Sequence, residues 1–197
     1  MKHFYRKHGK WIRAVAFIAV FLVTNQLLTQ YVVPAGLTRF ILHEVEDEQQ
    51  NYQVVIFGES LVSYGIDTET LESQTGKKTM QVSIGGEYMM DMYYLVQEMY
   101  KHQTPETVII DIDHTYWKDI PLKENTVTST LVYNNYPASF RKLSYFNEAM
   151  MNKEYRAVLF PWMNYRDHYS EVWNIFKTKN SEAYRNYDAS LVKQGFS

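Results

Sequence analysis

Apolar residues in the middle of the chain form two kinds of pattern: short continuous runs, and a spacing of three and four residues. Mostly apolar runs of strand length occur at 53–57 (QVVIF), 79–84 (TMQVSI) and 107–112 (TVIIDI). Such continuous runs are typical of parallel strands that are covered on both faces. Between the second and third runs, apolar residues recur at steps of three and four. They predict a helix from residue 87 to about 101 with one buried stripe, formed by Met89, Met92, Val96 and Met99.

The segment between the first two runs is also predicted to be helical. Asp67 or Thr68 is a suitable N-cap, and Gly76 a suitable C-terminal end. Strands that alternate with helices predict an α/β fold with a doubly wound parallel sheet. Beyond Pro121 we expect helices near 137–151 and 168–178, and a strand at 157–161 (AVLFP).

The N-terminal pattern is different and predicts a membrane anchor. Residues 14–33 carry no formal charge, and twenty residues are enough to span a bilayer. No small-x-small cleavage site is evident near VVPAG, so an uncleaved signal anchor is favoured over a cleaved signal peptide. We therefore expect a basic cytoplasmic flank at 1–13, a single transmembrane helix at 14–33, a stem at 34–50 and a folded domain at 51–197 outside the cytoplasm.

Charge and cysteine content narrow the function classes. The first 13 residues hold five of the chain's 20 basic residues and none of its 22 acidic residues, so the remainder is acidic. An acidic domain argues against nucleic acid as a partner. The absence of cysteine excludes disulfides, zinc-thiolate sites and thiol catalysis.

Chemically useful residues follow the ends of the predicted strands, where open α/β sheets bind ligands. Ser60 follows the first strand in Gly58-Glu59-Ser60-Leu61, and Gly85 and Gly86 follow the second. A serine there can act as a nucleophile, and backbone N–H groups at such turns can hold an oxyanion. The alternative is that Ser60 only caps a helix and that the glycine pair only forms a turn.

These two blocks resemble those of the SGNH/GDSL hydrolases. Gly58-Glu59-Ser60-Leu61 is similar to that family's Gly-Asp-Ser-Leu block, with Glu59 in place of the usual Asp, and Gly85 or Gly86 falls at its second-block glycine. With the anchor, the chain looks like the membrane-anchored SGNH-like proteins of Gram-positive envelopes. The resemblance implies a flavodoxin-like sheet and a serine esterase or O-acyltransferase, acting on acyl esters, above all acetyl esters, of an envelope polysaccharide.

The resemblance also implies roles for individual residues. Ser60 would be the nucleophile, and the backbone N–H groups of Ser60 and of Gly85 or Gly86 the oxyanion hole, with no metal or cofactor. The expected partners are the bilayer, a glycan or acyl ester substrate, and a membrane-bound O-acyltransferase.

Two expected parts of the family pattern are missing. Asp113-His114 stands where the family has its third-block Asn, and the family's Asp-x-x-His is not found. The proton acceptor would then be His114 or a histidine outside this chain. Glu59, Asp113, His114 and His168 are expected to line the site, and His102 is a less suitable base. The domain is expected to be incomplete at its C-terminus.

Two other functions remain open. A non-catalytic envelope protein would keep this scaffold to bind a glycan or an acyltransferase partner; the aromatic residues after the sheet would stack on sugars or simply pack helices (Trp117, Trp162, Tyr165, Tyr169 and Trp173). The run VIIDIDHT also looks like the nucleophile motif of the haloacid-dehalogenase phosphatases, with Asp111 and Asp113 sharing Mg²⁺. The closing acidic pair of that family is absent.

Overall fold

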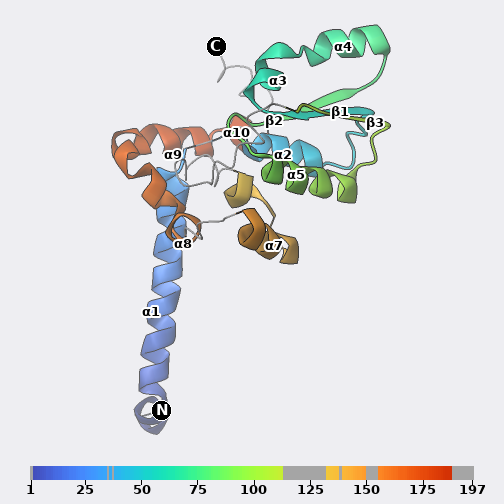
Figure 1. The fold of residues 1–197 in the computed structure, drawn as a ribbon. Coiled ribbons are helices and arrows are strands. Elements are labelled where there is room, and N and C mark those ends of the chain that lie inside the picture. Colours follow the sequence, from blue (N-terminus) through green and yellow to red (C-terminus); the bar gives the residue numbers. More distant parts are fainter. Residues whose placement is uncertain are drawn as a thin grey trace.

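The structure, a computed structural model, shows a small α/β domain on a long N-terminal helix (Figure 1). It describes residues 2–34, 36, 38–112, 132–137, 139–149 and 155–187. The elements of its first part are α1 (Lys2–Val32), α2 (Thr38–Glu46), β1 (Val54–Gly58), α3 (Ser60–Gly65), α4 (Thr68–Thr75), β2 (Thr79–Ser83), α5 (Met89–His102) and β3 (Thr107–Ile110). After these come α7 (Phe140–Ala149), α8 (Tyr155–Leu159), the 3-10 helix η2 (Pro161–Glu171), α9 (Val172–Asn180) and α10 (Glu182–Arg185).

The sheet has three parallel strands in the order β2-β1-β3. Val54 at the start of β1 pairs with Thr79 on one side and Thr107 on the other, so the three strands begin level. Figure 1 shows α3 and α4 on one face of the sheet and α2 and α5 on the other. The predicted mixed α/β class with a parallel sheet is therefore confirmed.

Alternation along β1 divides the core between the two faces. Val55 and Phe57 join the larger cluster with α2, β2, α5, α7 and the helical residues 132–135 with the adjoining Tyr136. Val54 and Ile56 join a smaller cluster with Val62 of α3. The methionine stripe of α5 lies in the larger cluster as predicted, since Met92 and Met99 are fully buried there.

α2 occupies most of the segment that the sequence suggested as a stem. Its residues Phe40, Ile41, Leu42 and Val45 are buried, and three of them belong to the main core cluster. The connection between α1 and the sheet is therefore a packed helix in this structure.

Two sequence predictions are wrong. Residues 157–161 do not form a strand: Tyr155–Leu159 is the helix α8, and Pro161 opens η2. The third strand is present but is not buried, since Ile109 and Ile110 are 44% and 43% exposed. β3 is an edge strand of the described sheet, so its apolar side chains lack the cover that a central strand receives.

The last described segment, 155–187, packs around the C-terminal half of α1, and we call it the collar. The ring of Phe160 meets Phe21 edge-on at 5.8 Å, and Phe176 meets Tyr31 at 5.4 Å. Asn25 donates to the carbonyl of Leu159 and accepts from the indole N–H of Trp162, both at 2.9 Å. The collar thus fixes α1 by apolar and polar contacts together.

The collar also reaches α2. Tyr184 and Tyr187 pack edge-on against Phe40, and the guanidinium of Arg39 lies over both tyrosine rings. Since α2 belongs to the core of the sheet, the collar links α1 to the α/β domain through a continuous set of side-chain contacts.

Candidate functional site

The carboxyl end of β1 places Ser60 beside the turn that follows β2. Glu59 is extended and is the N-cap residue of α3, and Ser60 is the first residue of that helix and is half-buried. A Cβ atom built on Gly85 would lie 4.0 Å from the Cβ of Ser60. The structure therefore brings together the serine and glycine blocks that the sequence singled out.

Gly58 makes this close arrangement sterically feasible. A Cβ atom there would lie 2.2 Å from Cγ2 of Val62 and 3.1 Å from the Cβ of Asp111. The last residue of β1 is thus in contact with both the first turn of α3 and the end of β3. Only a residue without a side chain fits between them.

The turn after β2 needs its second glycine for a different reason. Gly86 has φ +75°, a left-handed conformation that residues with a Cβ rarely adopt. The N–H of Glu87 donates to the carbonyl of Ile84 at 3.0 Å and closes the turn. Gly85 and Gly86 therefore hold a tight turn against Ser60.

Asp111 follows β3 and lies at the same edge of the sheet. Its N–H donates to the carbonyl of Phe57 at 2.9 Å, and its side chain is half-buried. Asp113 and His114 lie outside the described residues. The predicted Asp111-Asp113 pair and the role of His114 therefore remain predictions.

The histidines with described side chains, His43 and His102, contact residues other than Ser60. His43 stacks on Tyr187 with ring centres 3.7 Å apart. His102 ends α5, and its ring nitrogens lie 3.3 Å from Glu48 and 3.5 Å from Glu98. α5 starts after the carboxyl end of β2 and runs back along the sheet for 14 residues. His102, at its end, therefore lies near the amino ends of the strands, opposite to Ser60. His168 lies on η2 of the collar, and its side chain is not described.

A buried carboxyl group next to the turn was not predicted from the sequence. Glu87 is only 3% exposed, and neither of its carboxyl oxygens has a hydrogen-bond partner among the residues that the structure describes. Burial, together with the negative charges of Asp91 and Glu59, raises the pKa of Glu87 well above its usual value. Glu87 is therefore expected to be protonated where exposed glutamates are ionised.

Asp91, in the first turn of α5, shares this environment but has hydrogen-bond partners. It accepts hydrogen bonds from the N–H of Tyr88 at 2.9 Å and from the hydroxyl of Tyr145 on α7. Burial raises the pKa of Asp91 to about 6, although both hydrogen bonds oppose the rise. Sequence reasoning placed Glu87 in the first turn of a helix, where acids are common, and no local signal marks it as buried.

The ionisation of Glu87 predicts how stability depends on pH. The pKa of Glu87 is near 4.5 in the unfolded chain and higher in the folded protein, so the folded protein binds this proton more tightly. Ionisation of Glu87 therefore lowers the free energy of unfolding as pH rises above 4.5. Glu87→Gln removes the ionisation but keeps the shape. We expect the variant to match the wild type near pH 4.5 and to exceed it by about 1–3 kcal/mol at pH 8, as measured by urea unfolding.

Glu106→Gln is the matched control for that experiment. Glu106 is exposed, and hydrogen bonds from Lys77 and Gln53 lower its pKa, so its replacement should change stability little and with the opposite sign. Equal pH profiles for the wild type and Glu87→Gln would contradict a buried, unpartnered carboxyl group.

The comparisons with known proteins leave the class of the site to its geometry. No family model matches the chain, and neither the curated proteins nor the solved structures contain a significant match. Among the described residues, no group of three His, Asp or Glu side chains is placed to hold a metal ion.

Proposed function

We propose that the chain is a membrane-anchored serine esterase or O-acyltransferase of the SGNH type, acting on acyl esters of an envelope polysaccharide. The observation that carries this proposal is the close approach of Gly85 to Ser60: a Cβ atom added to Gly85 would lie 4.0 Å from the Cβ of Ser60. Serine hydrolases need backbone N–H groups next to the nucleophile, and this turn offers them at that place.

The order of the strands also supports the proposal. The order β2-β1-β3 equals the first three strands of the flavodoxin-like order, in which ligands bind outside the carboxyl ends of the strands where the order reverses. Ser60 and Asp111 both follow strands at that reversal, between β1 and β3. The position of the site is therefore the one that this topology favours for a ligand.

In the proposed reaction, Oγ of Ser60 attacks the carbonyl carbon of the acyl ester. The N–H groups of Ser60 and of Gly85 or Gly86 stabilise the oxyanion, and the bond to the sugar oxygen breaks as that oxygen takes a proton. Water or a second hydroxyl group then removes the acyl group from Ser60. The proton of Ser60 passes to His114 or to a histidine outside this chain.

The second candidate is a non-catalytic protein that binds a glycan or a membrane-bound acyltransferase. The observation that favours it is that His43 and His102, the histidines with described side chains, are both engaged elsewhere. A serine without a nearby base is a poor nucleophile at neutral pH. A scaffold with an inactive Ser60 would keep the same fold.

A fluorophosphonate probe separates the two candidates. We expect covalent labelling of the full chain at Ser60, located by peptide mass spectrometry, because such probes react with activated serines. Ser63, on the same helix, is the internal control and should stay unmodified. Absence of label on Ser60, in a sample whose unfolding transition is intact, would favour the non-catalytic protein.

A further inference from the structure

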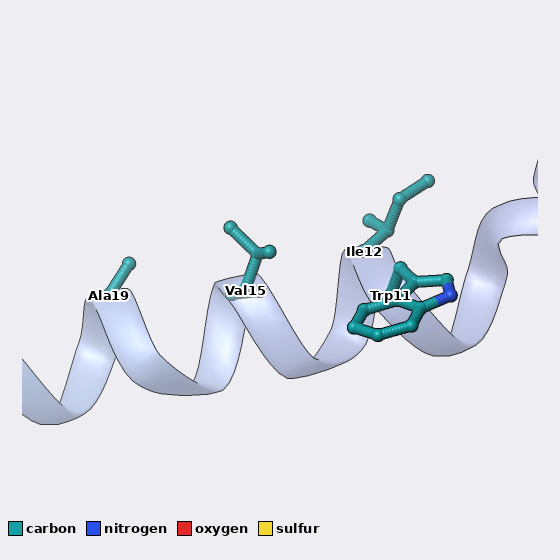
Figure 2. Close-up of a pocket in the computed structure, with 5 residues that line it drawn as sticks. Trp11, Ile12, Val15 and Ala19 are labelled. Atoms are coloured by element: carbon teal, nitrogen blue, oxygen red, sulfur yellow. The ribbon is translucent and has the colours of Figure 1, made fainter.

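α1 is exposed on at least one side along most of its length, since Phe21, Leu22, Val23 and Leu27 are still 45% to 59% exposed. Contact with the collar on the other side divides the helix into two parts. In the first part, every residue from 11 to 20 except Arg13 presents an apolar side chain to the outside. The side chains of Trp11, Val15 and Ala19 border a shallow apolar hollow along the helix (Figure 2). From Phe21 onward the helix is in contact with the collar. Polar residues become frequent in that same part, in the run TNQLLTQ.

The free part of α1 is too short to cross a bilayer alone. From Gly9, where the apolar span starts, to Val20 the helix measures about 18 Å at 1.5 Å per residue. The hydrocarbon core is about 30 Å thick and needs about 20 residues. A spanning α1 must therefore bring the residues from Phe21 to about Leu28, and the parts of the collar beside them, to the depth of the outer leaflet.

The outer side of the collar has the chemistry that this depth requires. Leu159, Tyr169 and Trp173 are 57%, 58% and 63% exposed although all three are large and apolar or aromatic. Trp and Tyr side chains concentrate at the level of the lipid headgroups. Lys177, whose ammonium lies 5.4 Å from the centre of the Trp173 ring, suits the same level because a lysine chain can extend to the phosphates.

Two polar side chains between α1 and the collar, Asn25 and Lys179, are compatible with a lipid environment because they are paired. Asn25 bonds to Leu159 and Trp162, and the ammonium of Lys179 donates to the carbonyl of Gln30 at 2.9 Å near the end of α1. An unpaired amide at this depth would cost several kcal/mol.

From these observations we propose that the collar is a lipid-docking surface. Its exposed Tyr169 and Trp173 sit in the headgroup layer of the leaflet from which the α/β domain projects, and Leu159, bonded to Asn25, enters the acyl chains just below it. The collar then holds the Ser60 edge of the sheet at a fixed height above the bilayer. This inference rests on the membrane anchoring of α1, which is part of the proposed function.

The absence of cysteine allows a direct test with single-cysteine variants of the full chain. Ser170→Cys places a probe between Tyr169 and Trp173 with minimal change, Ala16→Cys marks the free part of α1, and Ser73→Cys on α4 is the matched control. All three positions are exposed. Each variant is labelled with an environment-sensitive fluorophore and reconstituted in phosphatidylcholine–phosphatidylglycerol vesicles. The quenchers are lipids brominated near the headgroup or near the chain end.

We expect lipids brominated near the headgroup to quench position 170 at least about threefold more strongly than position 73. Lipids brominated near the chain end should quench position 16 most strongly. Adding Trp173→Ala and Leu159→Ala to the Ser170→Cys variant should lower the quenching at 170 and leave that at 16 unchanged. These results together support the collar as a lipid-docking surface.

Two other results overturn the inference and are distinguishable. Quenching at 16 with none at 170 would leave the anchor in place but refute docking of the collar. Absence of quenching at both positions would refute the anchor, and the docking with it. Neither result bears on fluorophosphonate labelling of Ser60, which tests the chemistry separately.

Discussion

Ser60→Ala is expected to lower acyl-ester cleavage or transfer by about a thousandfold or more, because removal of the nucleophile of a serine hydrolase leaves only the catalysis due to binding and the oxyanion hole. The measurement is the initial rate of release of acetate from an acetylated polysaccharide or a small acetyl ester. The loss should appear in kcat. The Ser60→Ala substitution should also abolish fluorophosphonate labelling.

Ser63→Ala is the matched control for that loss. Ser63 lies on the same short helix, so Ser63→Ala removes the same kind of hydroxyl group but leaves the proposed nucleophile in place. Its rate should stay within about twofold of the wild type, since surface substitutions away from a site have small effects. Unchanged activity of Ser60→Ala would remove Ser60 from the mechanism.

Gly58→Ala is expected to have the largest effect on stability, about 3 kcal/mol, because the added methyl group meets the side chain of Val62 at 2.2 Å. For a chain of this size that loss lowers the Tm by about 10 °C. The same displacement should move α3, and Ser60 with it, away from Gly85. Thermal unfolding followed by circular dichroism measures the first effect, and fluorophosphonate labelling the second.

Gly65→Ala provides the control for the change in chemistry. No atom of the described part of the chain lies within 4 Å of a Cβ at Gly65, so alanine should be neutral or slightly stabilising there. Val62→Ala in the Gly58→Ala background removes the closest atom, Cγ2, and should restore part of the stability. Equal stability of Gly58→Ala and Gly65→Ala would show that the turn after β1 has room that the structure does not indicate.

Features set by local interactions were predictable from the sequence. The helix predicted between Asp67 and Gly76 is α4: Asp67 accepts from the N–H groups of Glu69 and Thr70, and Gly76 ends the helix with φ +67°. Both signals depend on side-chain and backbone chemistry within a few residues. The meeting of Ser60 and Gly85 was predictable too, because the carboxyl ends of neighbouring parallel strands share an edge.

Features set by distant contacts were not predictable. The apolar run at 157–161 suits a helix as well as a strand, and only its place in the collar makes it α8. The isoleucines of β3 have the composition of a buried strand, but composition does not specify what covers them. The bonds of Asn25 join residues more than 130 positions apart, beyond any periodic pattern.

The contact of the collar with both α1 and α2 limits how far the α/β domain, and Ser60 with it, can move relative to α1. A domain on a flexible linker samples a hemisphere whose radius grows with linker length. Here Arg39 and Phe40 of α2 pack against the collar, which also bonds to Asn25 of α1. Under the proposed anchoring, the lateral position of the domain can therefore vary, but its height above the bilayer cannot. Under the proposed function, a long polymer must then present its own chain to this level, and modification is expected only on the portion that passes close to the membrane.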